Sequence, residues 1–411
     1  MDKITKLLSQ KITINKDKIA DFFDKEFKIN NALFYNSVDI RNSGFKVAGV
    51  DTNCFPAGFN NLRVRSLNNA IKESYAAITE KNSQIKNIII IPENNNRNIN
   101  YLENIATIYK MLSKNFNVKI CNINCENNQL KNIELDKGDK ITINDLLIDS
   151  NNKLYTENFV ADLAILNNDL SDGLPDIIRN SVTEIWPNPK IGWYNRSKFE
   201  HFTNYNEIAN EIARILDINP WLISTKIDLC DNIDFKAKSG IENLAHKVEI
   251  MLGNIKEEYK RNNINYQPAC YIKADCGTYG MAVWMVQNVD EIININKKNR
   301  NKMNITKGLV KNSKVIIQEA IPTIHKIDNK SAEPLLYMIN GKVIGNLFRV
   351  NENRDDINSL NANGANFYDI LNLDSKRINQ EYNSNELRLV NSLIATIAAL
   401  ASSKELSNKY L

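Results

Sequence analysis

Lys273 and the glycines that follow it are the residues of this sequence best suited to chemistry on a phosphate-bearing ligand. Residues 271–286 predict a strand, a turn at Gly277 and Gly280, and a second strand. Tyr271 and Lys273 share one face of the first strand, since side chains alternate across a strand. The ammonium supplies a point charge, and backbone N–H groups of a glycine turn can cradle phosphate oxygens. An ordinary hairpin with a solvated lysine also fits, because short glycine motifs often match by chance.

Two later segments carry polar groups that could complete such a site. Residues 314–319 predict a buried strand that ends in Gln318 and Glu319, and the Ala-Ile-Pro-Thr segment after it breaks the strand. Residues 333–350 predict a hairpin, because Asn-Gly between two β-rich runs favours a two-residue turn. A loop rich in asparagine and carboxylates follows. This order of elements resembles the ATP-grasp enzymes, which hold ATP between two antiparallel sheets.

A second polar cluster lies near the N-terminus. Residues 35–62 place charged and amide side chains among turn-forming residues: Asp39, Arg41, Lys46, Asp51 and Asn53. Loops with mixed charges on a rigid scaffold commonly bind small polar substrates. A solvated loop with local salt bridges is the alternative that composition alone allows.

The chain between these segments predicts a parallel sheet. A strand at 87–91, a helix at 100–112 and a strand at 117–123 indicate a right-handed βαβ unit, and residues 159–166 predict a further buried strand. Ligands bind beyond the carboxyl ends of such strands, which places Glu93, Asn95 and Arg97 near a possible site. Residues 1–35 predict a helix pair, residues 127–156 a hairpin insertion, and residues 384–401 a helix that serves packing.

Composition narrows the class of protein. The chain has 411 residues, 43% of them hydrophobic, and a net charge of +4 without a basic run, so nothing favours nucleic-acid binding. Its longest apolar runs are too short to span a bilayer, and the N-terminus lacks an apolar segment of signal-peptide length. The six cysteines are scattered and form no zinc pattern. We therefore expect a reduced, cytoplasmic protein with no membrane or nucleic-acid partner, which could form a homo-oligomer.

Seven segments in order resemble one family, the proteobacterial type of glutamate–cysteine ligase that has an ATP-grasp fold. They lie at residues 38–62, 91–105, 193–202, 272–283, 318–323, 333–351 and 359–367, and so extend over most of the chain. The strings VDTNCFPAGFNNL and KADCGTYGM are the long and specific ones. The resemblance implies synthesis of γ-glutamylcysteine from L-glutamate, L-cysteine and ATP, the first step of glutathione synthesis, through an acyl phosphate.

The resemblance also implies roles for individual residues. Lys273 would contact the phosphates of ATP, and Arg349 would stabilise the transferred phosphoryl group. Glu333 and Asn361 would hold Mg²⁺, since hard cations prefer oxygen ligands. The remaining ATP contacts would come from the turn after Lys273 and from a hinge beside adenine: Asp275, Gly277, Thr278, Tyr279, Gly280, Gln318, Glu319 and Ile321. The amino-acid substrates would be bound by the N-terminal cluster and the first βα loop: Asp39, Arg41, Lys46, Asp51, Asn53 and Arg97.

Some points do not fit the resemblance cleanly. A regular turn at Asn340-Gly341 would place Glu333 opposite Phe348, so either a bulge intervenes or Glu333 and Arg349 do not share a site. Ser359 stands where ATP-grasp enzymes usually have a second acidic metal ligand, for which Glu352, Asp355 or Asp356 could substitute. The lysine expected from the first ATP-grasp subdomain stays open between Lys226 and Lys238.

The predicted fold class is α/β, in part α+β: an ATP-grasp fold preceded by an N-terminal parallel-sheet βαβ substrate domain. The predicted domains are 1–185 for substrate binding, 186–265 as a helical lead-in, and 266–411 for nucleotide and metal. A ligase with another acceptor amine remains an alternative, because a fold does not fix its substrate. A nucleotide binder without catalysis is another, supported only by Ser359. A dinucleotide oxidoreductase needs a glycine-rich turn after an early strand, and neither early strand has one.

Overall fold

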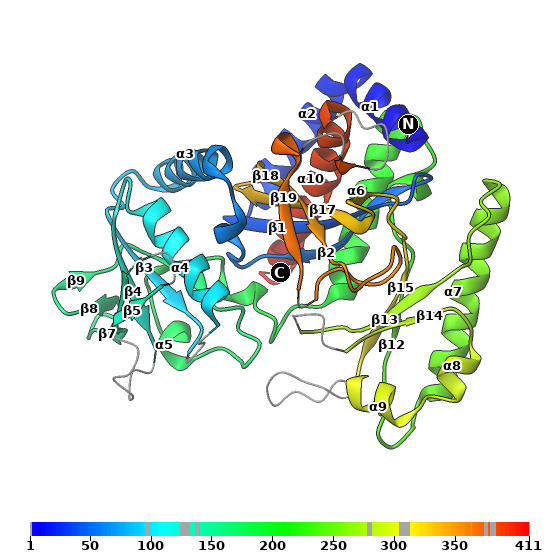
Figure 1. The fold of residues 1–411 in the computed structure, drawn as a ribbon. Coiled ribbons are helices and arrows are strands. Elements are labelled where there is room, and N and C mark those ends of the chain that lie inside the picture. Colours follow the sequence, from blue (N-terminus) through cyan, green and yellow to red (C-terminus); the bar gives the residue numbers. More distant parts are fainter. Residues whose placement is uncertain are drawn as a thin grey trace.

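The computed structural model describes residues 2–94, 98–123, 132–135, 138, 140–277, 282–303, 313–362, 364–373, 377–378 and 384–410. It is a mixed α/β protein in which three large sheets lie side by side (Figure 1). The central sheet is antiparallel and joins the two ends of the chain. Its strand order is β19 (Asn366–Asp369), β18 (Lys342–Val350), β17 (Lys330–Ile339), β1 (Tyr35–Asn42) and β2 (Val47–Asn53), with β16 (Lys326–Ile327) paired to β17.

Four helices cover one face of the central sheet: α1 (Lys3–Ile14), α2 (Lys16–Asn30), α6 (Lys198–Leu216) and α10 (Ser384–Asn408). Alternate residues of β1 and β17, such as Val38 and Leu336, bury their side chains against these helices, as the two-residue period of a strand requires. Among the described residues, α10 alone is long and apolar enough to cross a membrane, but 72% of its most apolar window is buried inside the protein. It is therefore a core helix, as the sequence predicts.

The second sheet lies on the N-terminal side of the molecule, to the left in Figure 1. Its order is β11 (Glu184–Trp186), β10 (Leu163–Asn167), β3 (Asn87–Pro92), β4 (Asn117–Asn122), β6 (Lys140–Asp145) and β5 (Asn132–Glu134), parallel except for β5. Helices α4 (Ile99–Leu112) and α5 (Asp176–Arg179) pack around it, and α3 (Val64–Lys81) packs between α4 and strands β17 and β18 of the central sheet. The predicted strand–helix–strand succession is present as β3, α4 and β4. A small sheet is formed by β7 (Leu147–Ile148), β8 (Leu154–Thr156) and β9 (Phe159–Val160).

The third sheet, to the right in Figure 1, is antiparallel. Its order is β12 (Ile227–Cys230), β15 (Val315–Glu319), β13 (Cys270–Ala274) and β14 (Val283–Val286). Helices α7 (Ile241–Arg261), α8 (Asp290–Ile293) and α9 (Lys297–Met303) pack with it around one apolar core. The predicted lysine strand and its return strand are thus confirmed as β13 and β14.

The turn between β17 and β18 forms as predicted, with Ile339 opposite Lys342 and positive φ at Asn340 and Gly341. A bulge then shifts the register, because Tyr337 pairs with Gly345 and Met338 with Val343, which leaves Ile344 as the extra residue. Glu333 consequently lies opposite Arg349 rather than Phe348. Of the two alternatives, the one with a bulge is correct, and the side chains of Glu333 and Arg349 point to the same face of the central sheet.

Two sequence predictions need correction. Residues 35–53 are not a turn-rich loop, because they form β1 and β2 inside the central sheet. Residues 159–166 are not one strand, because Ala161 and Asp162 separate β9 from β10. The predicted domain boundaries stay a prediction, but strand pairing groups residues 35–53 with β17 rather than with the parallel sheet.

Candidate active site

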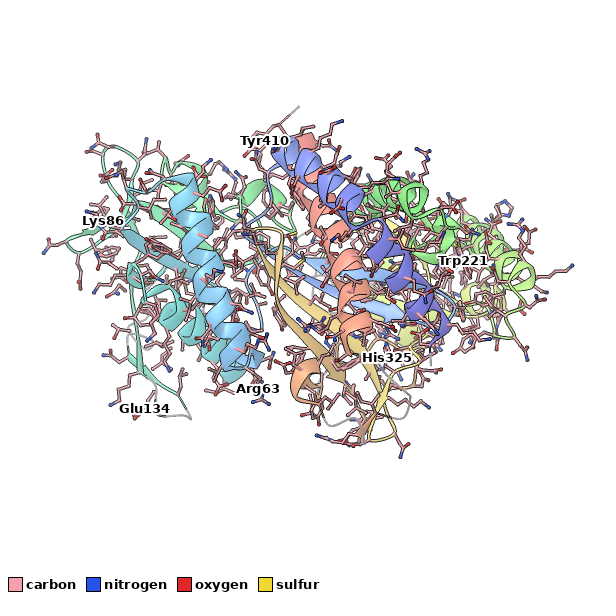
Figure 2. All side chains as sticks on the ribbon, turned by 90° about the horizontal axis from the view of Figure 1, so that it is seen from above. Arg63, Lys86, Glu134, Trp221, His325 and Tyr410 are labelled. Carbon is pink, nitrogen blue, oxygen red and sulfur yellow. The ribbon has the colours of Figure 1, made fainter. Side chains whose placement is uncertain are left out.

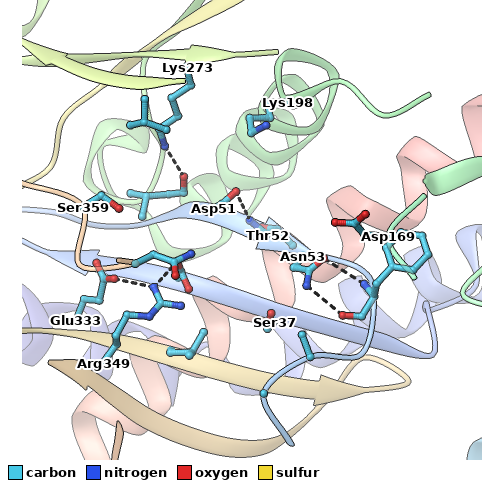
Figure 3. A pocket seen from close by; sticks show the side chains of 18 of the residues that line it. Ser37, Asp51, Thr52, Asn53, Asp169, Lys198, Lys273, Glu333, Arg349 and Ser359 are labelled. Carbon is cyan, nitrogen blue, oxygen red and sulfur yellow. Dashed lines mark hydrogen bonds and ion pairs between the residues drawn. The ribbon is translucent and has the colours of Figure 1, made fainter. Parts of the chain in front are cut away.

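A cavity of about 300 Å³ lies where the three sheets meet. The central sheet contributes one wall through β1, β2, β17 and β18, and β13 and β15 contribute another (Figure 3). Residues after the carboxyl ends of β3 and β10 close a third side. The polar lining comprises Ser37, Asp39, Arg41, Asp51, Thr52, Asn53, Asn61, Glu93, Asn167, Asp169, Lys198, Lys273, Gln318, Glu319, Glu333, Arg349, Ser359 and Asn361.

An acid–arginine cluster lines the central-sheet wall. The Arg349 Nη1 atom lies 2.6 Å from Asp39 Oδ2 and 2.8 Å from Glu333 Oε1. The Arg41 Nε atom lies 2.5 Å from Glu333 Oε2, and its two Nη groups donate to the backbone carbonyls of Asp356 and Asn358. All four charged side chains are buried, so each depends on the others for compensation of its charge.

The burial of this cluster changes the acidity of Asp39. Burial raises the pKa of the Asp39 carboxyl to about 6, Arg349 opposes that shift, and the neighbouring Glu333 adds to it. The Arg349 Nε atom has no hydrogen-bond partner among the described residues. An arginine held by two carboxylates with a donor left over is suited to bind a further anion in the cavity.

A lysine cluster lines the opposite wall. Lys273 donates to Gln318 Oε1 at 2.6 Å and to the Val50 carbonyl at 3.2 Å. Burial lowers the pKa of Lys273, and the neighbouring Asp51 opposes this. Burial would raise the pKa of Asp51, but Lys273 and Lys198 outweigh it and hold that pKa below its ordinary value. The buried Gln318 Nε2 atom has no described partner and is thus free to donate to a ligand.

Lys198 begins helix α6 and reaches the same cavity. Its Nζ atom donates to the Gly277 carbonyl at 2.6 Å and lies 4.2 Å from the centre of the Trp193 ring. Burial lowers the pKa of Lys198 to about 8, Asp51 opposes the shift and Lys273 adds to it. A group with this pKa loses its positive charge just above neutral pH.

We therefore predict an alkaline limb in the pH dependence of binding to this cavity. For the wild-type protein, the affinity for an anionic ligand should fall as pH rises through about 8, because Lys198 loses its charge there. In Lys198→Arg the limb should move upward, since a guanidinium stays charged. Lys190→Arg, a substitution at an exposed lysine outside the cavity lining, is the control. Coincident alkaline limbs in the wild type and Lys198→Arg would remove Lys198 from this role.

The structure brings most of the sequence-predicted residues to one place. Asp39, Arg41, Asp51, Asn53, Lys273, Gly277, Gln318, Glu319, Ile321, Glu333, Arg349 and Asn361 all line the cavity. Ser359, the residue that departs from the family pattern, lines it too, whereas Glu352, Asp355 and Asp356 do not. Arg97, Thr278, Tyr279 and Gly280 lie outside the described residues.

Two predicted residues are placed elsewhere. Lys46 is fully buried, with its Nζ atom 2.8 Å from Glu319 Oε2 and over the Trp221 ring, and it does not line the cavity. Asp275 accepts hydrogen bonds from Ser197 Oγ and the Phe199 N–H at the start of α6, so it caps that helix. Both side chains support the walls of the site from behind.

Sequence reasoning missed several lining residues. Lys198 is the most informative of them, because it lines the cavity. Lys226 and Lys238, the two candidates that the sequence offered for a further lysine, do not line it. The segment around Lys198 was part of the family resemblance, but nothing local shows that the first turn of α6 faces Gly277. Asn167 ends β10 and Asp169 follows it. The sequence places both at the carboxyl end of a predicted buried strand, where ligands of parallel sheets bind, but they were not selected as site residues.

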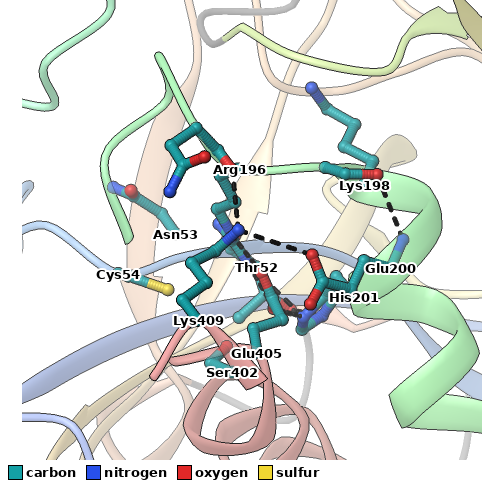
Figure 4. Close-up of polar contacts among 12 residues, drawn as sticks. Thr52, Asn53, Cys54, Arg196, Lys198, Glu200, His201, Ser402, Glu405 and Lys409 are labelled. Carbon is teal, nitrogen blue, oxygen red and sulfur yellow. Dashed lines mark hydrogen bonds and ion pairs between the residues drawn. The ribbon is translucent and has the colours of Figure 1, made fainter. Parts of the chain in front are cut away.

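A buried polar network lies behind β2 and ties α10 to the cavity wall (Figure 4). Glu405 on α10 accepts from Arg196 Nε at 2.9 Å and also contacts His201. Arg196 Nη1 donates to the Thr52 carbonyl at 2.6 Å, and His201 Nε2 lies 2.9 Å from Thr52 Oγ1. Thr52 lies between Asp51 and Asn53, so the network fixes the strand segment that presents both to the cavity.

Glu405→Gln should lower the free energy of unfolding by about 3–5 kcal/mol at neutral pH, because it leaves the buried Arg196 without its anionic partner. Burial would raise the pKa of Glu405, but Arg196 and His201 lower it to about 2 from the ordinary 4.5. The contribution is therefore present above pH 4.5 and is lost as pH falls towards 2. In urea unfolding, the difference in unfolding free energy between the wild type and Glu405→Gln should shrink over that range. Glu200→Gln, which loses a pairing with Lys409, is the control. A pH-independent difference would contradict this account.

Comparison with known proteins places this chain in a family. The sequence profile of the family described as glutamate-cysteine ligase matches residues 9–406. A solved structure from Methylobacillus flagellatus KT, provisionally described as a gamma-glutamylcysteine synthetase, is 33% identical, with a TM-score of 0.89 over 98% of this chain and 96% of the other. No curated protein matches the sequence.

Two further solved structures are only weakly similar. A glutathione synthetase-like effector from Globodera pallida is 11% identical, with a TM-score of 0.42 over 85% of this chain and 83% of the other. A D-Ala:D-Ser ligase from Enterococcus faecalis is 12% identical, with a TM-score of 0.39 over 77% and 83%. Such scores support no conclusion, whereas the family profile spans nearly the whole chain. The chain belongs to the glutamate–cysteine ligase family.

Proposed function

We propose that this cavity phosphorylates the γ-carboxylate of L-glutamate with ATP and joins the resulting acyl phosphate to the amine of L-cysteine. Family membership gives glutamate–cysteine ligation as the activity, and the proposal concerns how this site performs it. The observation that carries the proposal is the convergence of two cationic clusters on one cavity: Lys273 of β13 and Lys198 of α6 on one wall, Arg349 and Arg41 of the central sheet on the other. The arrangement we infer is that of an ATP-grasp enzyme, with ATP between the third and central sheets.

The residues present fit ATP. The unpartnered Gln318 Nε2 and the backbone around Ile321 offer hydrogen-bonding groups on the β15 side, where adenine would lie. Lys273 and Lys198 supply positive charge for the phosphates, and phosphoryl transfer depends mainly on such positioning and charge stabilisation. Gly277 lines the same cavity as both lysines.

The donor set also fits a hard cation. Glu333, Asn361 and Ser359 offer oxygen ligands on one side of the cavity, and Mg²⁺ is usually held by one or two carboxylates together with substrate phosphates. When bound there, Mg²⁺ would neutralise phosphate charge. Both oxygens of Glu333 contact arginines, so metal binding has to replace at least one of these contacts.

The chemistry follows from these groups. A γ-carboxylate oxygen of glutamate attacks the γ-phosphorus of ATP, the bond to the ADP oxygen breaks, and Arg349 stabilises the charge on the phosphoryl group. The cysteine amine then attacks the acyl carbon and the bond from that carbon to the phosphate oxygen breaks. The departing phosphate carries that oxygen and takes up the proton that the amine loses. Asp51, ionised beside two lysines, is placed to attract a substrate ammonium group.

An isotope experiment tests the acyl phosphate. With glutamate labelled by ¹⁸O in its γ-carboxylate, mass spectrometry should find the label in the released phosphate and should find γ-glutamylcysteine as the other product. Unlabelled phosphate together with the dipeptide would exclude phosphorylation of the carboxylate while leaving the ligase activity intact.

The metal site gives a separate prediction. Glu333→Gln should shift the Mg²⁺ concentration for half-maximal turnover upward by roughly tenfold or more, because it removes one anionic oxygen ligand. Glu352→Gln is the matched control, since Glu352 is exposed, pairs with Lys330 and lies outside the cavity lining. A metal titration identical to that of the wild type would place the ligand elsewhere.

The proposal also covers the substrates and the cellular location of the protein. The partners we propose are L-glutamate, L-cysteine and ATP. The five described cysteines are free thiols, four of them buried, which supports a reducing, cytoplasmic location.

A further inference from the structure

A second cavity of about 180 Å³ lies at the edge of the central sheet and shares no lining residue with the first. Strand β19 pairs only with Leu347–Val350 of β18, so residues 343–346 extend past its end. The start of α3 and the start of α10 approach this edge. The polar lining comprises Arg65, Ser66, Asn69, Asn346, Asp369, Arg388 and Ser392.

Asn346 is the first sign of an absent ligand. Its side chain is 9% exposed, and neither Nδ2 nor Oδ1 has a hydrogen-bond partner among the described residues. Buried amides are nearly always paired, since leaving donor and acceptor unsatisfied is unfavourable. An unpaired amide that lines a cavity therefore indicates a ligand able both to accept and to donate a hydrogen bond.

The beginning of α3 is the second sign. This helix starts after Arg63, labelled at its end in Figure 2, and no side chain in the described part of the protein caps its first turn. Arg65 and Ser66 belong to that turn and line the cavity. Free N–H groups and the helix dipole favour an anion at such a position. Gly345 allows the close approach, because a Cβ there would lie 2.7 Å from Leu62 Cδ2.

The charges agree with an anionic ligand. Arg65 comes from α3 and Arg388 from α10, and no salt bridge joins either guanidinium to a carboxylate in the described part of the chain. Asp369 also lines the cavity, but its Oδ1 accepts the Leu371 N–H at 2.8 Å. The lining thus offers two guanidinium groups, a helix start and an amide to an anion, and Asp369 is the single carboxylate among the described lining residues.

We propose that this cavity binds a phosphate group, either as the free ion or on a small phosphomonoester. The arginines and the helix start contact its oxygens from different directions, which suits a tetrahedral anion. Asn346 Nδ2 donates to a further oxygen. The proton of a monohydrogen phosphate satisfies Asn346 Oδ1, which sulfate cannot do, so the site selects phosphate over sulfate.

Calorimetric titration of the whole protein tests this site, with inorganic phosphate, glycerol phosphate and sulfate as probes. Phosphate should bind the Arg65→Gln/Arg388→Gln double variant at least about tenfold more weakly than the wild type. The adjacent Arg63→Gln, at an exposed arginine outside the lining, should bind like the wild type. Asn346→Leu should reduce the preference for phosphate over sulfate, and thermal unfolding checks that it folds. Glycerol phosphate tells whether an ester group is accepted in place of the free ion.

The same series in a Lys273→Ala background separates this site from phosphate held in the first cavity. The proposal predicts that the double variant loses binding in both backgrounds. It would be overturned if phosphate bound the wild type and the double variant equally, if sulfate bound as well as phosphate, or if Lys273→Ala alone abolished binding. None of these outcomes depends on whether the protein makes γ-glutamylcysteine.

Discussion

Lys273→Ala should lower kcat/KM for ATP by about 10²–10³-fold while the protein stays folded. Lys273 is the cation on β13 that faces the cavity, and the loss of one preorganised contact to developing charge costs about that much. The substitution leaves Gln318 Oε1 and the Val50 carbonyl without their donor, so a modest loss of thermal stability should accompany it.

The comparison needs a strand lysine that is not in the site. Lys326 on β16 is exposed and absent from the cavity lining, and Lys326→Ala should leave kcat/KM and stability close to the wild type. Near-normal turnover by Lys273→Ala, with an intact fold by circular dichroism, would remove Lys273 from the reaction.

Arg349→Ala should have the largest effect, with a loss of about 10³-fold or more in kcat, in the range known for arginines that stabilise phosphoryl transfer. It should also lower the free energy of unfolding by about 3–5 kcal/mol, because Asp39 loses its cation and Glu333 keeps only Arg41. Both effects follow from one side chain that compensates buried carboxylates and faces the cavity.

Arg349→Lys separates the two roles. A lysine retains the charge, so much of the stability should return, but it lacks the planar fork and should leave kcat far below the wild type. Arg377→Ala is the control, since it removes an exposed pair with Asp328 and a contact with the Tyr368 ring, both away from the cavity, and should leave kcat at the wild-type value. Recovery of kcat in step with stability in Arg349→Lys would show that Arg349 acts on the fold alone.

The sequence predicted the parts of the fold whose signals are local. The Asn340-Gly341 turn, the lysine strand and the strand–helix–strand unit rest on turn chemistry and hydrophobic periodicity, and all three are present. The bulge at Ile344 has no local signal, yet it decides whether Glu333 and Arg349 meet.

Strands β1 and β2 were not predicted, for a different reason. Asp39 and Arg41 look like loop residues because they are charged, whereas in the structure their partners are Arg349 and Glu333, about three hundred residues away along the chain. The place of Lys198 in the cavity could not be predicted either, because its contact with Gly277 exists only after α6 packs beside the third sheet. Long-range pairing of charges is the information that single-sequence patterns lack.

The most direct test of ATP-dependent ligation of L-glutamate to L-cysteine is phosphate release from ATP with Mg²⁺, measured together with the mass of the product. The tests use L-glutamate alone, L-cysteine alone, both together, and cysteine replaced by other small amino acids. Sustained release should occur only with the glutamate–cysteine pair and should be accompanied by the mass of γ-glutamylcysteine. ATP binding without release for any pair would contradict this ligation, and release with a different amine would contradict the choice of cysteine as acceptor.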